Sequence, residues 1–282
     1  MISDLHGNWP ALTTALADAE ERGVERFGCL GDVVGYGAKP RECLERVMAL
    51  IGSSPGSNSG PNSGPGVGPK PGVLAPGARL GLQPGFCLQG NHEQALMQSA
   101  AEFNPNARAA IEWTREELSS GADRERNLAL WDFLDTLRPL HSEPGAMYAH
   151  GSPRDPVREY MLPRDIRDAA KMRANFARMT EPVCFVGHSH VPAIYYEDGT
   201  FYRPKSTEGP YDLAIDAKRR AIVNVGSVGQ PRDGDPRLCY ALFDGRHVTF
   251  VRLEYDVAAA QRDIRAQSAL PAYLADRLSV GH

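Results

Sequence analysis

The sequence predicts an α/β protein with two β-sheets, and three observations lead to this prediction. In the first part of the chain, short apolar runs alternate with helical patterns, and the order strand, helix, strand is typical of α/β proteins. Beyond Gly145 the pattern changes to a series of short strands, which need a second sheet. The chain of 282 residues is also long enough to bury a substantial core.

The first elements follow from the spacing of their apolar side chains. Residues 10–22 have apolar side chains at helical intervals. Residues 26–30 read as a short buried strand that ends before Gly31, and residues 40–51 as a second helix. Residues 1–3 are too short for a full strand. We therefore expect the natural start of the protein to lie upstream of Met1.

Residues 52–84 are rich in Gly, Pro, Ser and Asn and interrupt this order. Such a composition cannot bury enough apolar area to offset the entropy that is lost on ordering. Strand and motif patterns resume at residues 85–89. We interpret residues 52–84 as a disordered insertion within a single domain that spans residues 1–282, and not as a domain boundary.

The second half combines helical and strand patterns. Two helices are predicted within residues 104–137, and one more near residues 164–178. Strands are predicted at residues 145–149, 182–187, 193–196, 221–225, 238–243 and 247–254. Residues 256–280 form a C-terminal helical tail of two short helices, which are separated at Leu270-Pro271.

Composition and charge disfavour several classes of partner. The formal net charge is −4 and the pI is near 6.1, so no basic field is available and stable nucleic-acid binding is not expected. No apolar stretch approaches the roughly 18–20 residues that cross a bilayer, so no membrane is expected either. The five cysteines are odd in number and scattered, which suits a reducing cytoplasm. The oligomeric state stays open.

Five short motifs fall at the ends of predicted strands. They are Asp4-Leu5-His6, Gly31-Asp32, Gly90-Asn91-His92-Glu93, His150-Gly151 and Gly187-His188-Ser189-His190. In an extended segment the side chains at positions i and i+2 lie on the same side, so each Asp-x-His or His-x-His pair can reach one ion. Strand ends are also where α/β folds bind ligands. The mixture of nitrogen and oxygen atoms suits Mn²⁺, Fe or Zn²⁺ better than Mg²⁺ or Ca²⁺.

Each motif alone has an ordinary explanation. An isolated Asp-x-His arises often by chance, a Gly-Asp pair is a turn pattern, and a single histidine after a strand is often a hydrogen-bonded core residue. Five of the eight histidines nevertheless lie in Gly-flanked strand ends. His141, His247 and His282 do not, and we interpret them as structural or exposed. The five motifs in one chain together predict a metal site.

The order of these motifs resembles that of the calcineurin-like metallophosphoesterase superfamily, which reads D-x-H, GD, GNH(D/E), H and GH-x-H. The resemblance covers nearly the whole chain, apart from residues 52–84 and the beginning of the first strand. Residues 31–37, 150–155 and 224–232 are similar to the small phosphodiesterase-like branch of bacterial members. The resemblance implies a four-layer α/β/β/α sandwich, with two mostly mixed β-sheets flanked by helices.

The resemblance also implies a centre of two divalent metal ions, Mn²⁺ first, with Fe, Zn²⁺ and Ni²⁺ as alternatives. The ligands of the first ion would be Asp4, His6, Asp32 and His190. Those of the second would be Asp32, Asn91, His150 and His188, so that Asp32 bridges the two. Ions about 3.5–4 Å apart share a water molecule, and the resulting hydroxide attacks phosphorus. His92 is assigned the role of the general acid for the leaving group.

Two arginines and one asparagine near these motifs have a less defined role. Arg154 and Arg232 lie in Gly/Pro-rich loops and are candidates for substrate binding, because an arginine can hold a phosphate through two parallel hydrogen bonds. A solvated surface arginine is the ordinary alternative. Asn8 is equally well explained as the cap of helix 10–22, and we leave it out of the site.

The substrate is the property that the sequence predicts least directly. Members of the superfamily cleave phosphoproteins, cyclic nucleotides, dinucleoside polyphosphates and lipid or sugar nucleotides. The ending of Gly90-Asn91-His92-Glu93 is typical of protein phosphatases, but that branch continues its GD motif into Asp-Arg-Gly, where this chain has Gly35-Tyr36-Gly37. We therefore expect a phosphodiesterase or nucleotide phosphohydrolase that acts on a small phosphoester. A Ser/Thr protein phosphatase or dinucleoside-polyphosphate hydrolase is the alternative, and a non-catalytic metal-binding scaffold is a further one.

Overall fold

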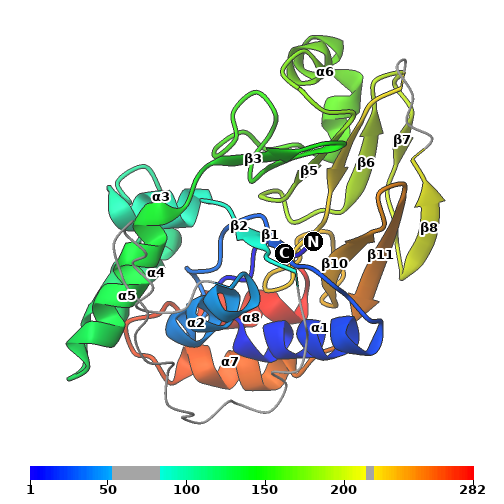
Figure 1. Cartoon of the computed structure of the whole chain (residues 1–282). Helices are drawn as coiled ribbons and strands as arrows, with labels where there is room; N and C mark the ends of the chain where they lie inside the picture. The colour runs from blue at the N-terminus through cyan, green and yellow to red at the C-terminus, as the bar shows by residue number, and fades with distance from the viewer. Residues whose placement is uncertain (53–82, 214–218) are drawn as a thin grey trace, which may run out of the picture.

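The computed structural model describes residues 1–52, 83–213 and 219–282. Two β-sheets pack face to face, and helices cover their outer faces (Figure 1). The predicted four-layer α/β/β/α sandwich is thus confirmed. The predicted insertion at residues 52–84 lies outside the described residues except at its two ends.

The first sheet is assembled from two pieces. Its strands are β1 (Gly28–Cys29), β2 (Phe86–Cys87), β8 (Glu208–Asp212), β10 (Leu238–Phe243) and β11 (His247–Leu253). β1 and β2 pair in parallel, whereas β10, β11 and β8 pair antiparallel. Ile2 forms a parallel bridge with Cys29, and the N–H of Ala241 donates to the carbonyl of Met1 over 3.0 Å. The first two residues therefore join both pieces into one sheet.

The second sheet has six strands in the order β3-β4-β5-β9-β6-β7. Their bounds are β3 (Leu140–Glu143), β4 (Ala146–Ala149), β5 (Val183–Val186), β6 (Ala193–Tyr196), β7 (Phe201–Tyr202) and β9 (Ala221–Asn224). β4, β5 and β9 run parallel to one another, and the outer strands pair antiparallel. A shared apolar core, with Phe185 and Phe250 fully buried, holds the two sheets together.

The helices cover the two outer faces. They are α1 (Trp9–Glu21), α2 (Pro40–Leu50), α3 (Asn91–Met97), α4 (Pro105–Ser119), α5 (Arg124–Thr136), α6 (Ala169–Phe176), α7 (Val257–Arg265) and α8 (Tyr273–Asp276), with 3₁₀ turns η1 (Pro163–Arg167) and η2 (Arg277–Ser279). Leu12 of α1 and Leu44 of α2 pack with the first sheet, and Phe176 of α6 with the second. Figure 1 shows α6 far from α1, α2 and α7.

Some predicted elements differ in detail. The helix expected near residues 164–178 is divided into η1 and α6, because the carboxylate of Asp168 accepts the N–H groups of Ala170 and Lys171 and caps a new helix. Helix α3 and strands β3, β7 and β8 were not expected. Helix α3 has only seven residues, which is too short for a helical period to show. Within the described part of the chain, no helix is both long and apolar enough to cross a membrane.

Candidate metal centre

The loops after the strands bring all seven predicted ligands to one place. Asp4 and His6 follow the bridge at Ile2, and Asp32 follows β1. Asn91 begins α3, His150 follows β4, and His188 and His190 lie between β5 and β6. Except for the half-buried Asn91, these side chains are at most 3% exposed.

The donor atoms of these side chains fall into two groups. In the first, His190 Nε2 lies 3.2 Å from Asp4 Oδ1 and 3.3 Å from His6 Nε2. In the second, His150 Nε2 lies 3.0 Å from His188 Nδ1 and 3.1 Å from Asn91 Oδ1.

Asp32 stands between the two groups. Its Oδ2 atom lies 3.8 Å from His6 Nε2 in the first group and 3.4 Å from His150 Nε2 in the second. The same carboxylate oxygen thus faces both groups. Such a set of imidazole nitrogens and carboxylate oxygens can hold divalent metal.

The second nitrogen of each of these imidazoles is fixed by a backbone carbonyl. The pairs are His6 Nδ1 with Val34 at 3.0 Å, His150 Nδ1 with Leu30 at 2.9 Å, His188 Nε2 with Arg158 at 3.1 Å, and His190 Nδ1 with Gln230. A carbonyl only accepts, so each of these nitrogens carries the proton. In the neutral ring, the opposite nitrogen, which faces the centre, then has a free lone pair. Metal-binding histidines have this arrangement.

Burial and charge favour a cation at this point. Burial lowers the pKa of His6, and that of His188 to about 3, which keeps both rings neutral. Burial also lowers the pKa of His150, but the carboxylate of Asp32 outweighs it and raises that pKa to about 9. Asp4 Oδ1 is buried and accepts no hydrogen bond from any described residue. A buried carboxylate oxygen without a donor fits a bound metal ion.

The backbone is strained at the same positions. Among the described residues, six that are not glycine have a positive φ: Asp4, His6, Asp32, Tyr36, His188 and His190. The left-handed region disfavours any residue with a Cβ atom, and such strain gathers at functional sites. Five of the six are predicted ligands, and the sixth packs beside them.

His92 lies at the edge of the centre and differs from the other histidines. Its Nε2 atom is 4.0 Å from Asp32 Oδ2, close enough to form a third possible cluster with His6 and Asp32. Its Nδ1 atom, however, is buried without a partner among the described residues. A Cβ atom on Gly35, where φ is +86°, would lie 2.1 Å from that nitrogen, so glycine makes room for the ring. His92 therefore lacks the carbonyl contact that the other four share.

Glu93 is a functional residue that the sequence analysis used only to compare branches. Its side chain is fully buried, and each carboxylate oxygen accepts two backbone N–H groups. Oε2 accepts from Asp32 and Gly90 at 2.8 Å, and Oε1 from Val33 and Val34 at 2.8 and 3.2 Å. Glu93 thus holds the Asp32 loop against the start of α3. A buried acid that directly follows the Asn91-His92 pair is the pattern that points to this role.

We expect Glu93→Gln to unfold more easily without changing the fold. The amide would turn an NH₂ group toward two of these four N–H donors, which leaves them unpaired in the interior. Loss of such bonds costs about 2–3 kcal/mol. Urea unfolding of the metal-free protein measures this change. Glu45→Gln, at a surface pair with Arg126, should stay near wild type, and equal stability of all three proteins would contradict the role of Glu93.

The two candidate arginines lie in different surroundings. The guanidinium carbon of Arg232 is 5.7 Å from the ring centre of Tyr36, whose ring packs against His6 and His92 at 4.7 and 4.6 Å. Arg154 instead forms an ion pair with Glu159. The structure therefore brings Arg232 beside the centre and engages Arg154 elsewhere.

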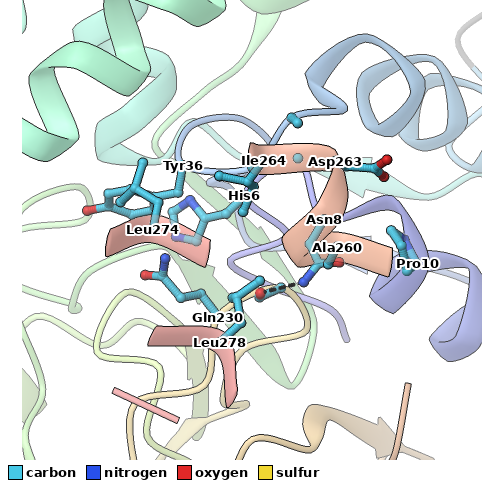
Figure 2. A pocket seen from close by; sticks show the side chains of 14 residues that line it. His6, Asn8, Pro10, Tyr36, Gln230, Ala260, Asp263, Ile264, Leu274 and Leu278 are labelled. Atoms are coloured by element: carbon cyan, nitrogen blue, oxygen red, sulfur yellow. Dashed lines mark hydrogen bonds between the residues drawn. The ribbon is translucent and has the colours of Figure 1, made fainter. Parts of the chain in front are cut away.

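Asn8 caps α1, as its position suggested. Its Oδ1 atom accepts the N–H of Ala11 at 3.2 Å, and its Nδ2 atom donates to the carbonyl of Gly229 at 2.8 Å. The second bond, drawn in Figure 2, ties the loop after β9 to the loop that carries His6. Asn8 thus helps to hold the loop that carries His6 in position.

A hollow of about 270 Å³ opens beside the centre. Its lining includes Asn91, His188, Tyr36, Phe103 and Tyr160. The ring of Tyr160 stacks on His188 with 3.8 Å between ring centres. The lining of the hollow therefore contains both predicted ligands and aromatic side chains.

Comparisons with known proteins agree with this geometry. Residues 1–197 match the sequence model of the calcineurin-like phosphoesterases. The whole chain is 31% identical to an uncharacterized protein of Methanocaldococcus jannaschii, MJ0912, and covers 97% of it. A metallophosphoesterase structure from Sphaerobacter thermophilus is 34% identical, with a TM-score of 0.73 over 100% of this chain and 97% of that one. A hypothetical protein of Pyrococcus horikoshii, PH1004, shares the fold at 21% identity, with a TM-score of 0.66 and the same coverage of 100% and 97%.

All five motifs lie within the matched residues, and the last of them ends at His190. The match covers well over half of the chain, and the relatives extend it to the full length. The chain belongs to the calcineurin-like phosphoesterase family and is a metal-dependent phosphoester hydrolase.

Proposed function

We propose that this enzyme is a phosphodiesterase or nucleotide phosphohydrolase with two metal ions. The ligands would be Asp4, His6, Asp32 and His190 for one ion, and Asp32, Asn91, His150 and His188 for the other. The observation that carries this proposal is the position of Asp32 Oδ2, which faces His6 Nε2 on one side and His150 Nε2 on the other. One shared carboxylate oxygen is what a pair of adjacent ions needs.

We propose Mn²⁺ as the first choice of metal from the donor atoms. Four imidazole nitrogens, two carboxylates and one amide suit Mn²⁺, with Fe, Zn²⁺ and Ni²⁺ as alternatives. When bound, the two ions would supply Lewis acidity that makes water a nucleophile at neutral pH and offsets charge on the phosphoryl oxygens.

The remaining chemistry belongs to side chains at the rim. We assign His92 as the general acid, because its Nε2 atom lies beside Asp32 and its other nitrogen is not fixed by a carbonyl. Arg232 would contact a phosphate group of the substrate, since its guanidinium stands over Tyr36 next to both His6 and His92. Arg154 has no part in this proposal, because its guanidinium already forms an ion pair with Glu159.

The hollow supports a small substrate with a flat group. Tyr36, Phe103 and Tyr160 offer aromatic surface beside Asn91 and His188. A nucleobase or another aromatic ester group can stack on such side chains. A protein phosphatase is the alternative. A scaffold without catalysis is disfavoured, because the seven ligands and His92 are all in place.

Hydrolysis of bis-para-nitrophenyl phosphate and of the mono-ester with added Mn²⁺ tests this proposal. We expect faster turnover of the diester and loss of both activities with a chelator. Preference for the mono-ester would favour a phosphatase. No turnover of either ester with Mn²⁺, Fe, Zn²⁺ or Ni²⁺ would favour the scaffold.

We also propose a cytoplasmic location and a single domain. All five cysteines are free and buried, which suits a reducing compartment. The C-terminal helices pack on the same apolar cluster as Tyr36, which supports one folded unit.

A further inference from the structure

The C-terminal helices lie against the metal centre. Leu274 of α8 and Leu278 of η2 belong to one apolar cluster with Tyr36, and both line a narrow cavity that reaches His6. Figure 2 shows Leu274 beside Tyr36, and Leu278 beside Gln230. Residues near the end of the chain, far beyond the five motifs, are thereby placed at the rim of the site.

Arg277 is the charged residue that this packing brings in. Its guanidinium carbon lies 5.7 Å from the ring centre of Tyr36. The guanidinium carbon of Arg232 lies at the same distance from the same ring. Two arginines from distant parts of the sequence therefore share one aromatic side chain that packs directly on His6 and His92.

Neither arginine forms an ion pair with an Asp or Glu side chain among the described residues. Arg232 donates to the amide oxygen of Gln230, and Arg277 Nε donates to a main-chain oxygen of His282, the last residue of the sequence. By contrast, the nearby Arg237 and Arg265 form ion pairs with Asp235 and Asp276. The rim thus carries two cations that are not paired with an Asp or Glu side chain of the described residues.

Bringing these two cations together costs energy. Arg277 is half-buried, and its pKa is lowered first by burial and next by the charge of Arg232. Like charges in a partly desolvated place repel each other more strongly than in water. An anion between or beside them would remove this repulsion, and the guanidinium groups offer several N–H donors to it.

We propose that Arg232 and Arg277 form a second anion subsite beside the metal centre. This subsite takes a phosphate group of the substrate other than the one that is hydrolysed. It rests on the proposed function and sharpens it, since the favoured substrates are then those with a second phosphate, such as nucleoside diphosphates and their esters.

The test compares AMP with ADP as competitive inhibitors of bis-para-nitrophenyl phosphate hydrolysis, at fixed free Mn²⁺ and from initial rates. The two probes differ by one phosphate. We expect the wild-type enzyme to bind ADP more tightly than AMP. Arg277→Gln should weaken the binding of ADP on the order of tenfold, as for loss of a charge-assisted hydrogen bond. The affinity for AMP and the kcat for the diester should stay within about twofold of the wild-type values. Arg277→Lys should recover part of the ADP preference.

Arg265→Gln on α7 is the matched control, because it removes a guanidinium from the same C-terminal segment but from a surface pair with Asp276. It should keep the ADP preference. Equal inhibition by AMP and ADP in the wild-type enzyme, or equal weakening of both in Arg277→Gln, would overturn the subsite. If the wild-type enzyme hydrolyses no ester, the proposed function fails, and calorimetric titration with AMP and ADP decides the subsite by the same comparison.

Discussion

Replacing Asp32 with asparagine is expected to remove metal and activity together. Asp32 Oδ1 accepts the backbone N–H of His92 at 2.9 Å, while Oδ2 faces both groups of ligands. An asparagine that keeps the bond to His92 must put its amide oxygen at the Oδ1 position. Its NH₂ group would then stand where the two proposed ions would need an oxygen, and that group has no lone pair to offer.

The measurement is metal content after dialysis, together with turnover of the diester. Activity should fall by more than the 10–100-fold that loss of an outer-shell partner costs. Asp18→Asn is the matched control, since Asp18 is a carboxylate on α1 that pairs with Arg22. It should keep both metal and activity. Normal metal content in Asp32→Asn would show that Asp32 does not bridge two ions.

Replacing His92 with alanine should have the opposite pattern, with metal retained and turnover lost. A positioned general acid contributes typically 10²–10⁴-fold to the rate. The backbone N–H of His92, which holds Asp32 Oδ1, is kept in the alanine variant. We therefore expect kcat for the diester to fall by about that factor while two ions stay bound.

The third possible cluster, formed by His92 with His6 and Asp32, makes this a sharp test. Metal analysis of His92→Ala distinguishes an acid from a ligand, because loss of an ion would mean that His92 holds it. His247→Ala is a suitable control, since His247 is on β11, away from the centre, and pairs with Asp244. Its metal content and rate should equal those of the wild-type protein.

The sequence was sufficient to predict that the seven side chains converge, because the predicted ligands follow strand ends and strand ends meet in this fold. Asp32 after β1 and His150 after β4 are examples, since a short apolar run and a glycine mark both positions. The resemblance to a family then grouped these residues into two sets. The distances between their donor atoms have the same grouping, with Asp32 between the sets.

Contacts that depend on tertiary packing could not be predicted in this way. Arg277 lies in a short 3₁₀ turn with no motif around it, and its approach to Tyr36 follows from the packing of α8. Likewise, the sequence does not predict that Arg154 forms an ion pair with Glu159 whereas Arg232 lies beside the centre. Strand β8 was missed because its Glu-Gly-Pro-Tyr-Asp sequence is polar and contains proline.

The left-handed backbone at the ligands bears on how this enzyme can be made more thermostable. The five strained residues among the predicted ligands are Asp4, His6, Asp32, His188 and His190. Each left-handed residue with a Cβ atom costs roughly 1–2 kcal/mol, which is large beside the roughly 5–15 kcal/mol that separates most folded proteins from their unfolded chains. Glycine would relieve this cost at every one of them and would delete a ligand each time. Selection for activity therefore opposes this gain in stability at all five positions.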